Sequence, residues 1–123
     1  MENKKIVLVV DDSAPNLRLC KGLLDKEYDV RLAKSGAMAL TALTRMRPDI
    51  VLLDIEMPDM TGFEVMEEMK KDRDQKDIPV ILVTSHASQK LVAKAMEQGT
   101  AGYIIKPFSP DVLREKIRDA LDG

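Results

Sequence analysis

Short apolar runs recur along the chain and alternate with longer segments of helical periodicity. Four of them span residues 6–10, 50–53, 80–83 and 102–105. Runs of this length are too short for a typical helix, and their continuous apolar character predicts strands that are covered on both faces. A fifth segment, residues 28–32, alternates apolar and charged side chains, which indicates a half-exposed strand near a sheet edge.

Each run is followed by an amphipathic segment that begins with residues typical of helix starts. Pro15 suits the first turn of a helix that we expect to reach about Lys26. Ser35 and Gly36 open a second helix, which stops before Pro48. The later helices begin at a capping box over 61–64, at 84–88 and at 109–111, and the second of these three ends at Gly99. Their expected inward residues include Phe63, Met66, Met69, Leu91, Val92, Ala95, Met96, Val112, Leu113, Ile117, Ala120 and Leu121.

Strand and helix therefore alternate five times, with no low-complexity linker. Alternating units with buried strands predict an α/β fold with one parallel sheet and right-handed crossovers. We expect a doubly wound, five-stranded, three-layer αβα sandwich in which the edge-like second strand gives the order 2-1-3-4-5. We assign residues 1–123 to one domain of this kind.

Composition and charge exclude several classes of function. The chain of 123 residues is 45% hydrophobic and 33% charged, as expected for a globular domain, and its net charge of −2 gives no basic surface for nucleic acid. No apolar run approaches membrane-spanning length, and the residues before position 6 leave no room for a signal peptide. The single cysteine, Cys20, falls among apolar helix residues. We therefore expect it to be a packing residue of a cytoplasmic protein.

Polar residues stand at the carboxyl ends of four of the predicted strands. These are Asp11 and Asp12, Asp54, Thr84 and Lys106. In the predicted order these strands are neighbours, so their ends converge at one edge of the sheet, where open α/β sheets bind ligands. Clustered carboxylates repel one another unless a cation lies among them, and Mg²⁺ prefers oxygen ligands and keeps several waters.

A carboxylate nucleophile, a metal, an ammonium group and a hydroxyl together suit phosphoryl transfer. Each residue alone is weak evidence, because an aspartate after a strand is usually a cap or turn residue and a lysine beside proline is usually a surface charge. The joint pattern of four strands, each ending in a suitable group, points to a phosphoryl-transfer site centred on Asp54.

At this point the sequence resembles the receiver domain of two-component response regulators, including the single-domain regulators of chemotaxis. The resemblance covers the whole chain and implies a flavodoxin-like topology. The matching motifs are VVDDS at 9–13, PDIVLLD at 48–54, MPDMTG at 57–62, VTS at 83–85 and GYIIKPF at 102–108.

The resemblance implies that Asp54 accepts a phosphoryl group from a phosphohistidine. Asp12 and Asp54 would bind Mg²⁺ or Mn²⁺, with Asp11 acting partly through water and Glu56 through its main-chain carbonyl. It also implies that Glu56 and His86 occupy positions that influence the lifetime of the phosphoryl group. We assign His86, the only histidine, to a solvated loop rather than to catalysis.

The same resemblance implies a conformational switch. Thr84 and Lys106 would hold phosphoryl oxygens, together with the main-chain amides near Ile55 and Ser85. The Lys106–Pro107 peptide would be cis and aim the lysine at the site. Tyr103 would be the switch aromatic, whose ring turns inward when the Thr84 hydroxyl moves toward the phosphoryl group.

The implied partners are a sensor histidine kinase or a histidine phosphotransfer protein, and an output partner or domain that the sequence does not specify. We expect a monomer or weak homodimer with no direct contact to nucleic acid or membrane. We also expect no enzymatic activity beyond self-catalysed phosphorylation and dephosphorylation.

Three other functions share parts of this pattern. A haloacid-dehalogenase-type phosphatase also uses a strand-end aspartate and Mg²⁺. That family has a second aspartate two residues after the first, whereas this chain has Glu56 at that position and no cap insertion. A flavodoxin-like cofactor binder would need a phosphate loop where Asp11 and Asp12 would repel the anion. A degenerate receiver that acts only as a protein-binding module would lack some of the signature residues, which are all present.

Overall fold

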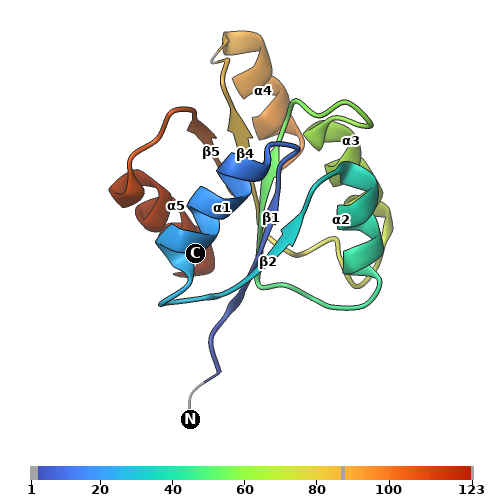
Figure 1. Ribbon diagram of the computed structural model, residues 1–123. Helices are drawn as coiled ribbons and strands as arrows, with labels where there is room; N and C mark the ends of the chain where they lie inside the picture. Colours follow the sequence, from blue (N-terminus) through green and yellow to red (C-terminus); the bar gives the residue numbers. More distant parts are fainter. Residues whose placement is uncertain (1–2, 87, 123) are drawn as a thin grey trace.

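The computed structural model describes residues 3–86 and 88–122, in which five strands and five helices alternate (Figure 1). The strands are β1 (Ile6–Val10), β2 (Asp29–Ala33), β3 (Ile50–Asp54), β4 (Val80–Thr84) and β5 (Gly102–Ile105). The helices are α1 (Ala14–Leu24), α2 (Gly36–Leu43), α3 (Gly62–Lys71), α4 (Gln89–Glu97) and α5 (Pro110–Asp122).

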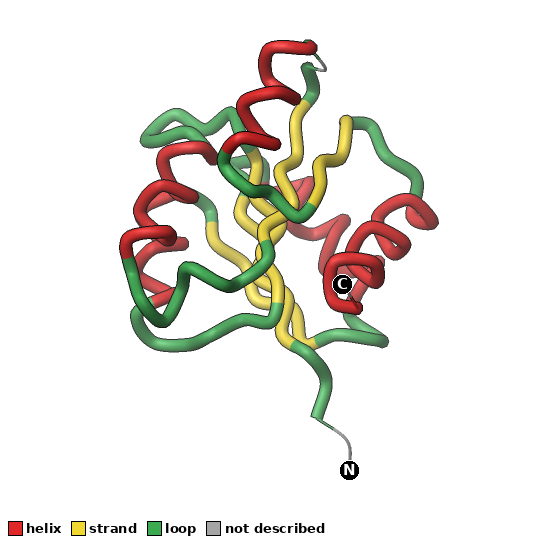
Figure 2. The backbone as a smooth tube through the Cα atoms, turned by 180° about the vertical axis from the view of Figure 1, so that it is seen from behind, coloured by secondary structure: helices red, strands yellow, loops and turns green. Residues whose placement is uncertain are grey.

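The strands form one parallel sheet in the order β2-β1-β3-β4-β5, which confirms the predicted topology. Helices cover both faces of this sheet. The view from behind in Figure 2 shows the strands as a central layer between them. Residues of α1 and α5 pack in one apolar cluster, and residues of α2, α3 and α4 pack in the other.

The strand side chains alternate between these two apolar clusters. In β1, Val7 and Val9 face α1 and α5, whereas Leu8 and Val10 face the opposite cluster. All five residues of β3 are buried, as the continuous apolar run predicts for a central parallel strand. Burial of one such side chain contributes roughly 1.5–3 kcal/mol, so the two clusters make the sheet a rigid platform for its carboxyl edge.

Two inward positions predicted from the sequence are wrong. Met96 in α4 and Val112 in α5 have exposed side chains, at 64% and 41% of their reference areas. Both helices flank β5, which is an edge strand. An edge strand offers its neighbouring helices less surface to cover, and in α4 the buried residue is Ala95.

Most helix starts agree with the sequence prediction, whereas the start of the fourth helix and the end of the first do not. The Thr61 capping box is confirmed, because the Thr61 side chain accepts from Glu64 N and the Glu64 side chain accepts from Thr61 N. The fourth helix, however, begins after its cap at Ser88, and Thr84 belongs to β4. The first helix ends at Leu24, before Lys26. Ala87, within the expected start of the fourth helix, lies outside the described residues.

The helices that the structure describes are all too short or too polar to cross a membrane.

Candidate functional site

The carboxyl edge of the sheet brings three aspartates together. Asp11, Asp12 and Asp54 each offer a carboxylate oxygen, and these oxygens all lie within 4.8 Å of one another. Asp11 and Asp54 are buried, at 6% and 5% exposure, whereas Asp12 is exposed. Such crowding of like charges is unfavourable without a positive partner, and an all-oxygen donor set suits a hard cation. The cluster therefore fits the Mg²⁺ or Mn²⁺ expected from the sequence.

The positive partner on the protein is Lys106, which follows the last residue of β5. Its Nζ donates to Asp11 Oδ2 at 2.9 Å and to Asp54 Oδ2 at 3.4 Å. The Lys106–Pro107 peptide is cis, in agreement with the expectation. Burial alone would lower the pKa of Lys106, but the hydrogen bond to Asp11 and the charges of Asp54 and Asp11 raise it above its ordinary value. The ammonium is therefore a permanent charge at the site.

Asp54 is an unusual carboxyl group. Burial raises its pKa from 3.8 to about 6; the Lys106 charge opposes this rise and the Asp11 charge adds to it. One oxygen, Oδ1, accepts from Glu56 N at 3.2 Å, and the other faces Lys106. The side chain is consequently fixed in place while its negative charge is only partly compensated. A cation at this point would complete the compensation.

The loop after β3 is held tightly against the strand end. A Cβ on Gly62 would lie 2.7 Å from the Asp54 carbonyl oxygen, so only glycine allows this close approach. Gly62 N donates to Ile55 O at 2.9 Å, and Ile55 N donates to Val83 O at 2.9 Å. The start of α3 and the end of β4 thereby fix the backbone directly after Asp54.

Asp11 also shapes the turn that leads into α1. Its Oδ1 accepts from Ser13 N at 2.9 Å, and its Oδ2 accepts from Asn16 Nδ2 at 3.4 Å. Ser13 is the N-cap of α1. Because Asp11 already accepts from these groups and from Lys106, it has fewer free lone pairs than Asp12 or Asp54 for direct metal binding.

Thr84 lies at the end of β4 and is 4% exposed, but its hydroxyl is directed toward the β3–α3 loop. Oγ1 lies 3.3 Å from Glu56 Oε1 and 3.1 Å from the His86 carbonyl, and it accepts from His86 N at 3.0 Å. The same Glu56 oxygen accepts from Ser85 Oγ at 3.3 Å, and Glu56 Oε2 lies 3.4 Å from His86 Nε2. The sequence predicts a main-chain ligand role for Glu56 and an influence on the lifetime of the phosphoryl group, but it does not predict these side-chain contacts.

Tyr103 lies in β5 opposite Leu82 of β4. Its ring is partly buried and packs against the cluster formed by α2, α3 and α4. The residue thus lies on the same strand pair as Thr84 and Lys106, at the edge of the packed interior.

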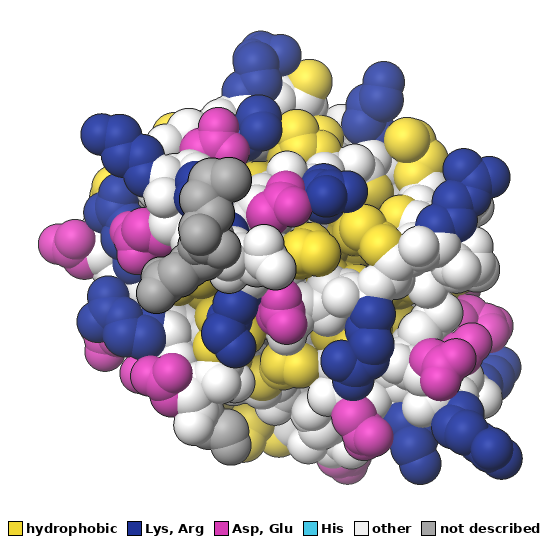
Figure 3. All heavy atoms as spheres, turned by 90° about the horizontal axis from the view of Figure 1, so that it is seen from below, with side chains coloured by type: hydrophobic (Ala, Val, Ile, Leu, Met, Phe, Trp, Pro, Cys, Tyr) yellow, Lys and Arg dark blue, Asp and Glu magenta, His cyan; other side chains and the backbone are white. Residues whose placement is uncertain are grey.

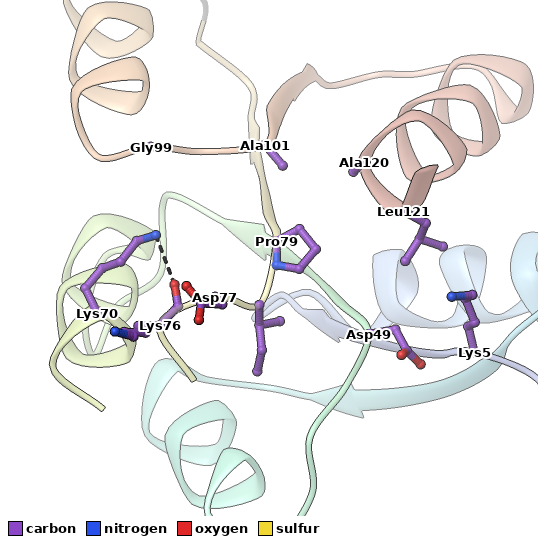
Figure 4. Close-up of a pocket in the computed structure, with 11 residues that line it drawn as sticks. Lys5, Asp49, Lys70, Lys76, Asp77, Pro79, Gly99, Ala101, Ala120 and Leu121 are labelled. Atoms are coloured by element: carbon purple, nitrogen blue, oxygen red, sulfur yellow. Dashed lines mark hydrogen bonds between the residues drawn. The ribbon is translucent and has the colours of Figure 1, made fainter. Parts of the chain in front are cut away.

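A surface hollow of about 520 Å³ lies at the opposite, amino-terminal edge of the sheet (Figure 4). Charged side chains of both signs line it, namely Lys5, Lys70, Lys76, Asp49 and Asp77. Lys70 Nζ donates to the Lys76 carbonyl at 3.3 Å, and Asp49 Oδ2 accepts from Ile6 N at 2.7 Å. Figure 3, seen from this end, shows acidic and basic side chains interspersed over the surface. None of the predicted site residues lines this hollow.

Comparisons with known proteins agree over nearly the whole chain. The family model for the response regulator receiver domain matches residues 7–118. A chemotaxis protein CheY homolog of Campylobacter jejuni is 37% identical over 118 residues, which are 94% of this chain and 91% of that protein. The hybrid signal transduction histidine kinase D of Dictyostelium discoideum is 34% identical over 117 residues, which are 95% of this chain and 8% of that protein. A CheY-like receiver domain protein of Methanospirillum hungatei superposes with a TM-score of 0.90 at 33% identity, covering 98% of this chain and 95% of that one.

Proposed function

This chain belongs to the family of response regulator receiver domains, and on that premise we propose that it accepts a phosphoryl group on Asp54. The donor would be a phosphohistidine. An Asp54 carboxylate oxygen attacks the phosphorus atom, the phosphorus–nitrogen bond breaks, and the imidazole nitrogen keeps the electron pair and takes a proton from solvent. In-line transfer of this kind depends on positioning and charge neutralisation rather than on further covalent chemistry.

One observation carries the proposal. Asp54 is a buried carboxylate with two further carboxylates within 4.8 Å and a lysine ammonium at 3.4 Å. Burial of charged groups is unfavourable, and the three clustered carboxylates carry more charge than the Lys106 ammonium can compensate. The arrangement fits a site that binds both a cation, which the carboxylates attract, and an anionic phosphoryl group, which the Lys106 ammonium attracts.

The metal would be held by Asp12, Asp54 and the Glu56 main-chain carbonyl, with Asp11 acting through water. The exposed Asp12 carboxylate and the largely occupied Asp11 carboxylate support this division. When bound, Mg²⁺ or Mn²⁺ would neutralise charge on the phosphoryl oxygens. These residues supply oxygen ligands only, as hard cations prefer.

The remaining phosphoryl oxygens would contact Lys106, Thr84 and the main-chain amides near Ile55 and Ser85. Lys106 is already within 3.4 Å of Asp54, whereas the Thr84 hydroxyl must turn from its present partners. We propose that this turn vacates space for the Tyr103 ring. A packed interior favours two discrete arrangements, so phosphorylation would select one of them.

The partners would be a sensor histidine kinase or a histidine phosphotransfer protein, and an output partner that recognises the switched state. The relative in Dictyostelium discoideum is itself a hybrid histidine kinase, which supports a kinase-linked role for receivers of this sequence. We propose that residues 1–123 act as one receiver domain, as a monomer or weak homodimer, in the cytoplasm. Buried, unpaired Cys20 is compatible with a reducing compartment.

The proposal is tested with acetyl phosphate, a small phosphoryl donor, and the intact mass of the protein. We expect one phosphoryl group per chain when Mg²⁺ is present and none when a chelator removes it. An unmodified mass under both conditions would contradict the proposal. Sustained turnover of an exogenous phosphate ester would instead favour a phosphatase.

A further inference from the structure

The Glu56 side chain connects two loops at the carboxyl edge of the sheet. Glu56 lies in the loop after β3. Its carboxylate contacts Thr84, the last residue of β4, and the two residues that follow it. Oε1 lies 3.3 Å from both Thr84 Oγ1 and Ser85 Oγ, and Oε2 lies 3.4 Å from His86 Nε2. The Glu56 main chain is tied to the site as well, because its N–H donates to Asp54 Oδ1 at 3.2 Å.

The Thr84 hydroxyl has one hydrogen, and the two acceptors it contacts belong to Glu56 and His86 rather than to Asp54. That hydrogen can be donated to Glu56 Oε1 at 3.3 Å or to the His86 carbonyl at 3.1 Å, and the oxygen itself accepts from His86 N. A carboxylate is the stronger acceptor of the two, because hydrogen bonds to ionised groups are charge-assisted. Glu56 therefore stabilises the arrangement in which the hydroxyl is turned away from Asp54.

We propose that Glu56 is a positioning residue that holds the Thr84 hydroxyl away from Asp54 until Asp54 is phosphorylated. The inference rests on the proposed phosphoryl-acceptor function. It assigns the Glu56 carboxylate to the switch, in addition to the main-chain role in metal binding.

Phosphorylation would release this hold in two ways. Phosphorylation replaces the single negative charge of the Asp54 carboxylate with roughly two on the phosphoryl group, which repels the Glu56 carboxylate more strongly. The new phosphoryl oxygens also compete for the single Thr84 hydrogen. Lys106, which could neutralise Glu56, is instead bonded to Asp11 and Asp54. Because Glu56 and the phosphoryl group compete for one donor, Thr84 has two mutually exclusive partners and the switch has two states.

A purely structural role for Glu56 would predict a loss of stability on its removal. The Glu56 and His86 side chains are 48% and 71% exposed, so their pairing contributes little to the free energy of folding. Substitution of Glu56 should therefore leave the fold intact while changing the position of Thr84. The two roles are separated by measuring the Thr84 rotamer directly.

The first experiment uses the full chain without phosphodonor and measures three-bond NMR couplings to the Thr84 methyl carbon, which report χ1. We expect Glu56→Ala to raise the population of the second Thr84 rotamer about two- to tenfold, the equivalent of one ordinary hydrogen bond. Glu56→Gln, which keeps an acceptor oxygen, should raise it less. Glu67→Gln removes the same charge from an exposed position on α3 and should leave the rotamer unchanged. An unchanged rotamer in Glu56→Ala would overturn the inference.

The second experiment measures the rate of Asp54 phosphorylation by acetyl phosphate and Mg²⁺ in a double-mutant cycle. Releasing Thr84 enlarges the fraction of protein that is ready to bind a phosphoryl group, so Glu56→Ala should raise the rate about two- to tenfold. In a Thr84→Val background, which has no hydroxyl to release, the same substitution should change the rate by less than about twofold. An equal gain in both backgrounds would show that Glu56 acts by direct repulsion of the donor and would overturn the inference.

The two hypotheses fail in different ways. If the wild-type chain takes no phosphoryl group, the proposed function is wrong, whatever the Thr84 rotamer does. If the wild-type chain is phosphorylated and Glu56→Ala changes neither the rotamer nor the rate, only the positioning role of Glu56 is wrong.

Discussion

The two ends of the parallel sheet both carry acidic and basic side chains, but they hold them in different ways. At the carboxyl end, Asp11 and Asp54 are buried beside a single ammonium, that of Lys106. At the amino end, Asp77 and Lys76 are exposed around an open hollow of about 520 Å³. Solvent compensates charges at the amino end, whereas protein groups must do so at the carboxyl end.

The difference shows that an unbalanced, buried charge marks a functional site better than the volume of a hollow does. Burial raises the pKa of Asp54 to about 6, which records the cost of keeping this carboxylate ionised. The amino-end hollow is lined by lysines and aspartates in similar numbers. The charges that line this hollow therefore do not require a cation or a phosphoryl group to balance them.

The largest expected effect is the loss of phosphorylation in Asp54→Asn. The amide cannot form the acyl phosphate, so incubation with acetyl phosphate and Mg²⁺ should leave the intact mass unchanged. Asp77→Asn makes the same substitution at the amino end and should be modified as fully as the wild-type chain. Equal loss in both variants would erase the distinction between the two ends.

Metal binding provides the next largest effect. Asp12→Asn removes one carboxylate from the cluster and should weaken Mg²⁺ affinity at least about tenfold, measured by calorimetry. Mn²⁺ at substoichiometric amounts should broaden the amide NMR signals near Asp12 and Asp54 and spare those near Asp77. Broadening centred on the amino-end hollow would contradict this account.

Lowering the pH should weaken metal binding through Asp54. Its pKa of about 6 in the folded, metal-free protein means that protons compete with the cation below this pH, and the Mg²⁺ dissociation constant should rise up to about tenfold per pH unit. Calorimetric titrations between about pH 5 and about pH 7 check the slope. A pH-independent dissociation constant would show that Asp54 is not a ligand.

The raised pKa of Asp54 also makes the stability of the folded protein depend on pH. The direction of this dependence is opposite to that of a salt-bridged aspartate, whose pKa is lowered. The folded pKa lies above the ordinary value of 3.8, so the folded protein binds the proton more tightly than the unfolded chain. Without metal, the stabilisation is present at low pH and is lost as the pH rises through about 6. Asp54→Asn should flatten this part of the thermal stability profile, whereas Asp77→Asn should not.

The smallest expected effect on phosphorylation is that of Lys106→Ala. Mg²⁺ can still neutralise the carboxylates, so some modification should remain, slowed by roughly threefold to tenfold for the loss of one charge-assisted contact. The switch should be uncoupled, because the ammonium no longer links the phosphoryl group to β5. Chemical shifts of the Tyr103 ring with and without acetyl phosphate report this coupling, and Lys76→Ala at the amino end serves as the control.

The location of the site can be predicted from the sequence because its residues lie at strand ends. Once alternation predicts a parallel sheet, the positions of Asp11, Asp54 and Lys106 follow from the strand order, which the structure confirms. The apolar runs and the capping box at Thr61 are local features of the sequence, and the structure contains the strands and the helix start that they predict.

The features that sequence reasoning missed depend on tertiary geometry. The Glu56 carboxylate reaches Thr84 from a loop that Gly62 holds close to the Asp54 backbone, and the sequence pattern does not encode this approach. Similarly, helical periodicity identifies an apolar stripe but not the width of the sheet beneath it. Met96 and Val112 are therefore exposed beside the edge strand despite their inward pattern.

The central claim is that phosphorylation occurs at Asp54, and borohydride trapping tests it most directly. The protein is incubated with acetyl phosphate and Mg²⁺, the acyl phosphate is reduced to the corresponding alcohol, and the altered residue is located by peptide mass spectrometry. We expect homoserine at position 54 and unaltered aspartates at 49 and 77. Reduction at another carboxylate, or at none, would contradict the claim.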